Sequence, residues 1–370
     1  MKKMLIYWPN GVFNEIQITK EIGAIAASAL RQHVNITIIC GGAKASMDNI
    51  VFHETGITKR TKLSEIMDTM IALTYLLRES PDYILLYYIE NYGNILLITM
   101  MKTFLKVFRL FYKNIKIPKI MIKSDTDGEF IEANNIFIRI AYRILLVFYL
   151  RFTDGVIVET TCVLEKIAQF LKRRSGFVYL PDGYSSQLFN HENNVIRKSC
   201  IITIARFLPF KNIEASVRIF KRISSSHHET IFKIIGPITD IDYYEYIKTI
   251  IIQANMQDKI EILSPSSQEL ANIVKESLIM ISTSLMESFG IARMEVLGSG
   301  TPVVTYESGC GKDFEKFGAI VVPLGDEDSM YNEVIRLLEN HSYWEKKSLE
   351  GIKNSISWDE VVSRLMKLFE

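Results

Sequence analysis

Glu287 to Glu295 reads E-S-F-G-I-A-R-M-E, and V-L-G-S-G-T-P-V-V follows it directly. An apolar run typical of a buried strand, Leu278–Ile281, comes just before this stretch. A strand that turns through a glycine into a helix leaves backbone N–H groups free at the helix start, where an anion or a sugar oxygen binds well. The two glutamates are eight positions apart, about two helical turns, so we expect them near one face of the helix.

An acidic residue near a helix start is common for structural reasons alone, because it caps the helix and complements its dipole. The spacing of Glu287 and Glu295 is therefore a weak signal by itself. Its surroundings strengthen it. The string from Gly298 onward predicts a helix end, a tight turn at 300–302 and a further buried strand at Val303 and Val304.

The same alternation of apolar strands and helical patterns extends along the whole chain. Continuous runs of Ile, Val, Leu and Tyr are typical of parallel strands that are covered on both faces. The sequence thus predicts an α/β protein with doubly wound parallel sheets. The predicted strands are Met4–Trp8, Ile36–Cys40, Tyr83–Tyr88, Lys119–Lys123, Gly155–Glu159, Val178–Leu180, Cys200–Ala205, Phe232–Ile235, Ile260–Leu263, Leu278–Ser282, Pro302–Tyr306 and Ala319–Val322.

A domain boundary is predicted near residues 180–199. The turn signal L-P-D-G-Y at Leu180–Tyr184 is followed by a polar run, and a new strand begins at Cys200. We expect a Rossmann-like domain at 1–185 and a second at 186–355, with a ligand in the crevice between the carboxyl ends of the two sheets. Residues 356–370 form a predicted amphipathic helix with Ser357 as its N-cap.

Bulk composition excludes several classes of protein. The 370 residues are 48% hydrophobic and 23% charged with a net charge of +1, which argues against disorder and against a nucleic-acid binder. The four cysteines show no metal-ligand spacing, so we expect reduced thiols and a cytoplasmic location. The N-terminal apolar run is too short for a signal peptide, and no run reaches the roughly 18 residues that span a bilayer.

Two cations mark the junction after the strand that opens the second half. Arg206 and Lys211 lie five positions apart in A-R-F-L-P-F-K-N, before a predicted helix. Cations so placed suit a diphosphate, which an arginine binds bidentately. A solvated basic loop is the alternative, and the expected position at the carboxyl end of a strand favours the diphosphate.

The second half resembles the donor-binding domain of retaining glycosyltransferases of family 4, which have the GT-B fold. The matching segments are the A-R-F-L-P-F-K-N junction, I-I-G-P at 234–237, E-S-F-G-I-A-R-M-E, G-S-G-T-P-V-V-T and the closing S-W-D-E-V-V. They cover the chain well from about residue 180 to its end. Before that, only the β-α order and P-D-G-Y agree with the family. The resemblance implies two Rossmann-like domains facing across a cleft, with the terminal helix crossing back to the first domain.

The resemblance also implies roles for individual residues. Two departures affect the local geometry: Asn212 stands where the family usually has glycine, and Arg293 replaces a common proline. The implied roles are diphosphate binding for Arg206 and Lys211, contact with donor-sugar hydroxyls for Glu287, backbone amides towards sugar and phosphate for Ser288, Phe289, Gly290 and Ile291, and acceptance of ribose hydroxyls for Glu295.

Two segments of the first half are further candidates. Trp8-Pro9-Asn10-Gly11-Val12 resembles the family loop that closes on the diphosphate, although a simple turn with Gly11 is equally consistent. K-S-D-T-D-G at 123–128 stands where many members have a histidine near the donor sugar. We expect Asp127 or Asp125 to contact donor or acceptor there, with Asp127 favoured, while an Asx turn capping the next helix is the alternative.

A basic amphipathic stretch at about 99–123 suits an anionic membrane surface. The alternative is an ordinary helix with solvated cations. The apolar segment 144–150, with its flanking cations, extends the expected surface. The interleaved cations are Lys102, Lys106, Arg109, Lys113, Lys116 and Lys119, and the extension adds Arg139 and Arg143.

These observations predict a retaining glycosyltransferase that moves a sugar from a nucleoside-diphosphate sugar to a lipid-linked or membrane-proximal glycan. We expect neither a metal nor a cofactor, because two cations and helix amides offset the leaving diphosphate. The oligomeric state stays open. The alternatives are a non-catalytic nucleotide-sugar-binding partner and a GT-B-type epimerase or phosphorylase. A dehydrogenase is disfavoured because no dinucleotide glycine fingerprint is present.

Overall fold

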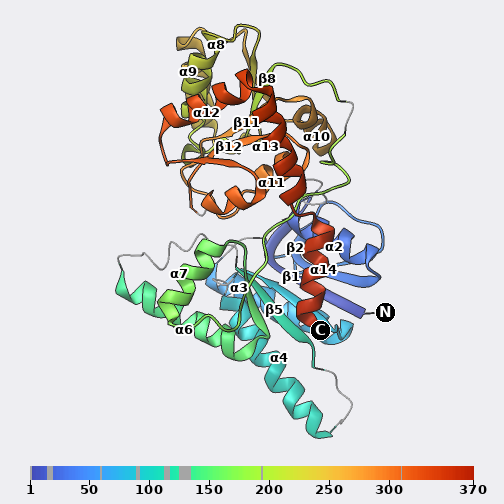
Figure 1. Ribbon diagram of the computed structural model, residues 1–370. Coiled ribbons are helices and arrows are strands. Elements are labelled where there is room, and N and C mark those ends of the chain that lie inside the picture. The colour runs from blue at the N-terminus through green and yellow to red at the C-terminus, as the bar shows by residue number, and fades with distance from the viewer. Residues whose placement is uncertain are drawn as a thin grey trace. The chain divides into compact units, whose positions relative to one another are not determined.

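The computed structural model describes residues 2–14, 20–58, 61–88, 92–111, 117–124, 135–192, 195–309 and 311–370, with no side-chain description at 62, 92, 102 and 104–111. The chain forms two compact units (Figure 1). Unit 1 comprises Met1–Pro181 together with Trp358–Glu370, and unit 2 comprises Asp182–Ser357. Each unit is a parallel sheet covered by helices, as the alternation of apolar strands and helical patterns predicts.

Unit 1 contains a parallel sheet of order β3-β2-β1-β4-β5-β6-β7. Its central strands are short apolar runs that are buried along their whole length, as in β4. The chain moves outward from β1 to β3 and then returns beside β1 at β4, which makes β1/β4 the switch point of the sheet. The strands are β1 (Lys2–Phe13), β2 (Val34–Ala43), β3 (Ile50–Glu54), β4 (Tyr83–Tyr87), β5 (Lys119–Ser124), β6 (Gly155–Val158) and β7 (Phe177–Tyr179).

Helices cover both faces of the unit 1 sheet. Right-handed crossovers place α2 on one face and the helices between β3 and β7 on the other, because the direction of progression along the sheet reverses at β1 (Figure 1). The terminal helix α14 packs against α2. The helices are α2 (Glu21–Arg31), α3 (Lys62–Glu79), α4 (Tyr92–Phe111), α6 (Ile136–Phe152), α7 (Thr161–Leu171) and α14 (Trp358–Phe369).

Unit 2 repeats this architecture with a parallel sheet of order β10-β9-β8-β11-β12-β13. Its strands are β8 (Cys200–Ile204), β9 (Ile231–Ile235), β10 (Ile260–Leu263), β11 (Ile279–Ser282), β12 (Val303–Tyr306) and β13 (Ile320–Val322). Its helices are η1 (Pro209–Lys211), α8 (Ile213–Ser224), α9 (Ile241–Gln253), α10 (Ser267–Glu276), α11 (Ile291–Gly298), η2 (Gly311–Phe317), α12 (Glu327–Glu339) and α13 (His341–Asn354).

Each predicted strand coincides with an observed one, and β3 is the strand that the sequence pattern missed. Ile50–Glu54 is a partly exposed edge strand, so its sequence I-V-F-H-E lacks the continuous apolar character of a buried strand. Within the described residues no helix combines the length and apolar character needed to cross a bilayer. The described cysteines Cys40, Cys162 and Cys200 are free thiols, whereas Cys310 lies outside the described residues.

Candidate active site

The candidate site of unit 2 lies at the carboxyl ends of β8 and β11. These strands are neighbours in the sheet, yet β9 and β10 separate them in sequence. The strand order therefore reverses between them, and such a switch point is where open α/β sheets bind ligands. The segment after β8 contains Arg206 and Lys211, and the segment after β11 contains Glu287.

Hydrogen bonds tie the two segments together. The backbone N–H of Leu285 donates to the carbonyl of Phe210 at 2.8 Å. The hydroxyl of Thr283 donates to the carbonyl of Asn212 at 2.8 Å and lies 2.7 Å from the Ser216 hydroxyl. These contacts hold the loop that carries Glu287 against the short helix η1 that carries the cation.

Lys211 and Glu287 form an ion pair across these segments. The Lys211 Nζ donates to the Glu287 Oε1 at 2.6 Å, and the two side chains are 10% and 16% exposed. Because the pair is largely shielded from water, its two charges interact more strongly than a surface pair would. The structure thus brings together two of the side chains that the sequence assigns to the site, although they are 76 positions apart.

The environment of Glu287 keeps its carboxylate ionised. Burial by itself raises the pKa of Glu287, but the positive charges of Lys211 and Arg293 and hydrogen bonds from Lys211 and Ser284 outweigh it. The net result is a pKa below the ordinary glutamate value of 4.5. The lowered pKa favours the ionised form of Glu287, which accepts hydrogen bonds near neutral pH.

Arg206 has a different environment. Its side chain is exposed, and among the described residues it forms no hydrogen bond or ion pair. Because no described residue engages its guanidinium, its donors can turn towards a ligand. The candidate site therefore contains one cation that is ion-paired, Lys211, and one exposed cation that no described residue pairs with, Arg206.

Arg293, which the sequence treats as a departure from the family, is a buried part of the site. It is 2% exposed, its guanidinium lies 4.1 Å from the centroid of the Phe314 ring, and it donates to Thr305 at 3.2 Å and to the carbonyl of Phe289. It also lowers the pKa of Glu287 through its charge. Sequence reasoning missed this supporting role, which depends on the fold of the loop.

The helix after β11 begins later than the spacing of the glutamates suggests. Gly290 has a φ of +88° and is the N-cap of α11, so Glu287 lies in the preceding loop. The expectation that both glutamates share a helix face is therefore wrong, since only Glu295 is helical. Glu295 is 1% exposed, so contact with a ribose requires this carboxylate to become accessible.

The residues between the glutamates differ in what they can offer. Phe289 is 1% exposed, and its ring packs against Phe314 at a centroid distance of 5.0 Å. Its side chain is part of the core, so only its backbone can face a ligand. Ser288, Gly290 and Ile291 are partly exposed, which leaves their backbone groups near the surface at the start of α11.

Asn212 adopts a backbone conformation that explains a glycine at this position in the family. Its φ and ψ are 50° and 45°, in the left-handed region, at the point where η1 ends and α8 begins. Glycine adopts this conformation most readily, and asparagine is among the few other residues that tolerate it. The substitution therefore preserves the turn after Lys211.

In unit 1, the position of Gly11 corrects the prediction of a loop. The strand β1 continues to Phe13, and Gly11 lies in an irregularity of its pairing with β2 between Trp8 and Val12. A Cβ at Gly11 would lie 2.1 Å from the Trp8 ring, so only glycine fits this bulge. The Trp8 Nε1 donates to the Tyr88 hydroxyl at 2.9 Å, across the β1/β4 switch point.

Asp125 and Asp127 lie outside the described residues. Lys123, which precedes them in sequence, is 3% exposed and is ion-paired with Glu21 and with Glu159. Sequence reasoning grouped this lysine with Asp125 and Asp127 and missed both glutamates, because they are 102 and 36 positions away. The structure adds a buried charged cluster at the carboxyl edge of the unit 1 sheet.

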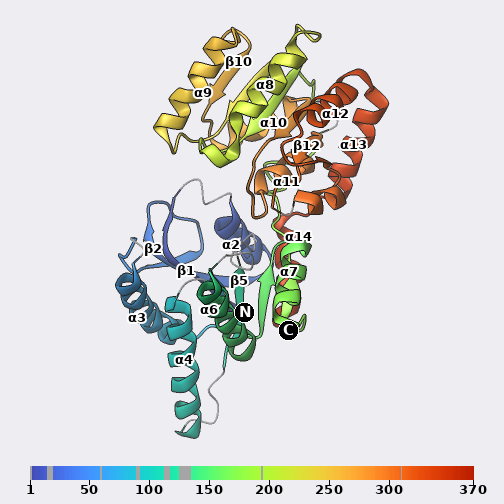
Figure 2. The ribbon, with the colours of Figure 1, turned by 90° about the vertical axis from the view of Figure 1, so that its left-hand side faces the viewer.

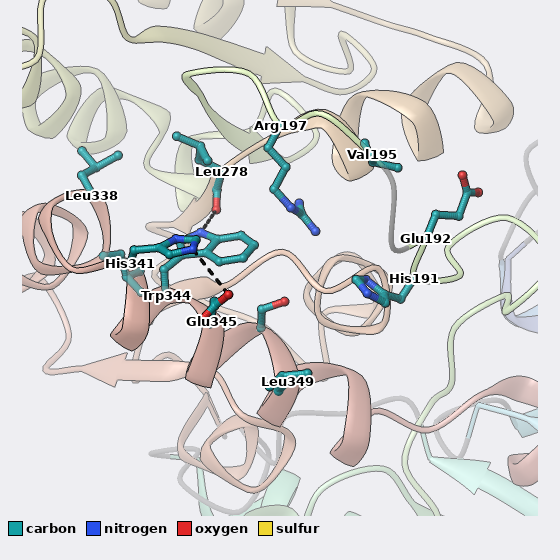
Figure 3. A pocket seen from close by; sticks show the side chains of 12 residues that line it. His191, Glu192, Val195, Arg197, Leu278, Leu338, His341, Trp344, Glu345 and Leu349 are labelled. Atoms are coloured by element: carbon teal, nitrogen blue, oxygen red, sulfur yellow. Dashed lines mark hydrogen bonds and ion pairs between the residues drawn. The ribbon is translucent and has the colours of Figure 1, made fainter.

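Unit 2 also contains a pocket of about 570 Å³, whose lining includes none of the predicted site residues (Figure 3). Arg197 and Leu278, which line it, precede β8 and β11. The guanidinium of Arg197 donates to the carbonyls of Lys275, Ser277 and Gly300 at 2.8–3.1 Å. These hydrogen bonds give the Arg197 guanidinium a structural role in the loops that precede the strands. Arg197 is therefore less available to a ligand than the exposed Arg206.

Comparison with known proteins agrees with this geometry. Residues 186–357 match the family model of glycosyl transferases group 1. The matched segment contains Arg206, Lys211, Glu287 and Glu295. Unit 2 is therefore similar to group 1 glycosyltransferases, which agrees with the coarser part of the family resemblance.

Two curated relatives are glycosyltransferases by name. The chain is 26% identical over 170 residues to the GDP-Man:Man(3)GlcNAc(2)-PP-Dol alpha-1,2-mannosyltransferase of Dictyostelium discoideum, which covers 42% of this chain and 34% of that protein. It is 27% identical over 204 residues to the poly(glycerol-phosphate) alpha-glucosyltransferase of Bacillus subtilis, covering 54% of this chain and 30% of that protein. The chain thus spans about a third of the length of these two relatives.

Solved structures share the fold over the whole chain. Sucrose-phosphate synthase from Thermosynechococcus elongatus has a TM-score of 0.75 at 13% identity and covers 100% of this chain and 98% of its own. Anabaena HepE, solved with UDP and glucose, has a TM-score of 0.71 at 11% identity and covers 99% of both chains. The predicted α/β fold with two Rossmann-like domains, GT-B, is confirmed.

Proposed function

We propose that this chain is a retaining glycosyltransferase that transfers a sugar from a nucleoside-diphosphate sugar to the hydroxyl of a lipid-linked or membrane-proximal glycan. The observations that carry the proposal are the Lys211–Glu287 ion pair at the β8/β11 switch point and the exposed Arg206 in the segment that follows β8. We propose a cytoplasmic enzyme that binds the inner face of the membrane peripherally and needs neither a metal nor a cofactor.

The diphosphate of the donor would be bound by two kinds of group. Arg206 has a planar set of donors suited to two phosphate oxygens, and Lys211 supplies a second charge. The start of α11, after Ser288 and Gly290, adds backbone N–H groups and the positive end of the helix dipole. A diphosphate that binds Lys211 competes with Glu287 for the same ammonium group, so donor binding weakens this ion pair.

The carboxylates would recognise the sugar and the ribose. Glu287 is ionised and accepts hydrogen bonds, which suits hydroxyl groups of the transferred sugar. Glu295 lies further along the same segment and would accept the ribose hydroxyls. From unit 1 we propose that Asp127, or its neighbour Asp125, contacts the donor or acceptor sugar, and that the segment of Gly11 contributes to donor binding.

Transfer would proceed by departure of the nucleoside diphosphate from the sugar. Negative charge grows on the departing phosphate oxygen, and Arg206 with Lys211 would stabilise it in place. The acceptor hydroxyl would attack from the face that the phosphate leaves, so that the new glycosidic bond forms as the bond to the phosphate oxygen breaks and the hydroxyl proton passes to that departing oxygen. The family resemblance supports retention of configuration, and the proposal adopts it.

The donor base and sugar are the first properties to test. The names of related proteins point to different donors, since one is a GDP-mannose enzyme and HepE was solved with UDP and with glucose. Thermal unfolding would be measured with UDP, GDP and ADP and with their glucose and mannose derivatives. We expect one nucleotide to raise the melting temperature of the wild type and of Lys221→Ala, an exposed cation outside the site, but not of Arg206→Ala/Lys211→Ala.

Transfer itself distinguishes an enzyme from a non-catalytic binding partner. Purified chain, radiolabelled donor and a membrane extract that contains the acceptor should yield a labelled glycolipid. Binding of the nucleotide without transfer, hydrolysis or epimerisation would favour the partner role. Conversion of the donor sugar without an acceptor would favour an epimerase, and dependence on inorganic phosphate would favour a phosphorylase.

A further inference from the structure

Helices α3, α4 and α6 lie side by side over one face of the unit 1 sheet (Figure 2). Within the described residues, 21 large hydrophobic side chains are exposed, and ten of them lie on α3 and α6. A surface helix of a globular protein ordinarily directs its apolar stripe inward and its polar residues outward. These two helices depart from that arrangement.

In α6 the apolar stripe faces outward. Only Leu146 and Tyr149 are buried among its 17 residues. The exposed residues Phe137, Ile140 and Ile144 recur at helical spacing and are 78%, 48% and 66% exposed, so they form one stripe. Ile136 and Val147, at 56% and 52% exposed, extend the stripe at both ends.

The first half of α3 shows the same inversion. Leu63, Ile66, Met67 and Met70 are 45–69% exposed and lie on one side of the helix. The acidic residues of this segment point the other way. Asp68 is completely buried and accepts a hydrogen bond from the Tyr7 hydroxyl at 2.6 Å, and Glu65 is 5% exposed. The outer side of this half-helix is therefore apolar and carries no acid.

The charged residues of α6 itself are all positive. Arg139, Arg143 and Arg151 are exposed, and α6 contains no acidic residue. Apolar side chains on one side, flanked by arginines with long aliphatic stems, are the composition of a helix that lies in the interface of an anionic bilayer. Most side chains of the predicted membrane-binding stretch 99–123 lie outside the described residues. Its Lys119 is described and donates to the Glu370 carbonyl at 2.7 Å. Among the described residues, α6 is therefore the better candidate for a membrane-binding helix.

We propose that the outer stripes of α3 and α6 dock on an anionic lipid bilayer, with Phe137, Ile140, Ile144, Met67 and Met70 entering the interface. A second copy of the chain fits this surface less well. A twofold contact through α6 would place its arginines opposite one another, and α6 itself has no acid to pair with them. The inference deepens the proposed function and rests on its membrane-binding part. Vesicle binding is measured without donor or transfer, so its failure would leave the assignment of sugar transfer intact.

Co-sedimentation with vesicles tests this surface. The full chain would be mixed with vesicles of phosphatidylcholine alone and of phosphatidylcholine with phosphatidylglycerol. We expect binding to the second kind, and roughly tenfold weaker partitioning for Ile140→Ser/Ile144→Ser and for Met67→Ser/Met70→Ser. Arg139→Gln/Arg143→Gln should weaken binding by roughly thirtyfold at low salt and flatten its salt dependence.

Two controls make the outcome specific. Ile241→Ser removes a side chain that is 70% exposed in unit 2, and Arg174→Gln removes an exposed cation of unit 1 outside the stripes. Both should bind like the wild type, and all variants should keep the wild-type melting temperature and its nucleotide-induced shift. Absence of wild-type binding to anionic vesicles, equal binding by stripe and control variants, or a dimer that Ile140→Ser/Ile144→Ser dissociates would each overturn the proposal.

Discussion

At the scale of single residues, the charge of Glu287 links stability to pH. Its pKa in the folded protein is below the ordinary value of 4.5. A carboxyl group with a lowered folded pKa contributes stability that is complete above its unfolded pKa and is lost as the pH falls through its folded pKa. The ion pair with Lys211 should therefore stabilise the protein near neutral pH and fail in acid.

Glu287→Gln tests this linkage. We expect a loss of about 2 kcal/mol in the free energy of unfolding at neutral pH, because the substitution leaves the shielded Lys211 ammonium without its counter-charge. The difference from wild type should shrink as the pH falls below 4.5. Urea unfolding at several pH values measures it. Glu245→Gln, which alters a surface pair with Lys248, should change stability little at any pH. A difference that is constant with pH contradicts the assignment.

Arg206→Ala separates ligand binding from stability. The side chain is exposed and forms no hydrogen bond or ion pair within the described part of the chain, so the variant should unfold like the wild type. Turnover should fall roughly a hundredfold, because a charge-assisted contact to the leaving phosphate is lost. Steady-state transfer kinetics measure this effect, with Lys221→Ala as the matched cation outside the site. Unchanged kcat/KM in Arg206→Ala would remove this arginine from the site.

At the scale of elements, the turn between η1 and α8 depends on a left-handed residue. Asn212 has a φ of 50°, and its carbonyl accepts a hydrogen bond from the Thr283 hydroxyl at 2.8 Å. This hydrogen bond helps to hold the turn in its left-handed conformation. Asn212→Gly should change the free energy of unfolding by less than about 1 kcal/mol, because glycine adopts this conformation without strain. It should also retain transfer.

Asn212→Val provides the contrasting substitution at this turn. A β-branched residue is strongly disfavoured at positive φ, so we expect a loss of roughly 1–3 kcal/mol in urea unfolding. The strain lies next to Lys211, and transfer should fall as well. Equal stability of the glycine and valine variants would show that the left-handed conformation is not required.

At the scale of the whole molecule, the chain returns to unit 1 after completing unit 2. The helix α14 contributes Trp358, Val361, Val362, Leu365 and Phe369 to the core of unit 1. Asp359 accepts hydrogen bonds from Ser28 and Arg31 of α2, both at 2.6 Å, and the Phe369 ring stacks on Tyr83 at a centroid distance of 4.7 Å. The last helix is therefore a structural part of the first unit.

Leu365→Ala should destabilise unit 1 although the residue lies near the C-terminus. Leu365 is 1% exposed, and truncation of a buried leucine costs roughly 2–5 kcal/mol. Hydrogen exchange should rise in β1 and α2 and stay unchanged in β8 and α8. Arg364→Ala, an exposed neighbour on the same helix, should leave exchange unaltered. Equal loss of protection in both units would contradict the assignment of α14 to unit 1.

The sequence by itself determined the elements and the fold class. Buried parallel strands are continuous apolar runs, and a helix between two such runs leaves few topologies open, so the strands and the doubly wound sheets were predictable. The GT-B architecture was predicted from the family resemblance of the second half. The exception is β3, a partly exposed edge strand whose sequence lacks a continuous apolar run. The assignment of Arg206, Lys211 and Glu287 to strand ends also followed from order along the chain.

Only the tertiary structure decided which side chains meet. Lys211 reaches Glu287 because β8 and β11 are neighbours in the sheet, and Lys123 reaches Glu21 and Glu159 across strands that are distant in sequence. The sequence pattern also does not predict that Arg293 lies within the site. Nor does it predict that the apolar stripes of α3 and α6 face outward. Periodicity records that a helix has an apolar side, whereas packing against the rest of the chain decides which way that side faces.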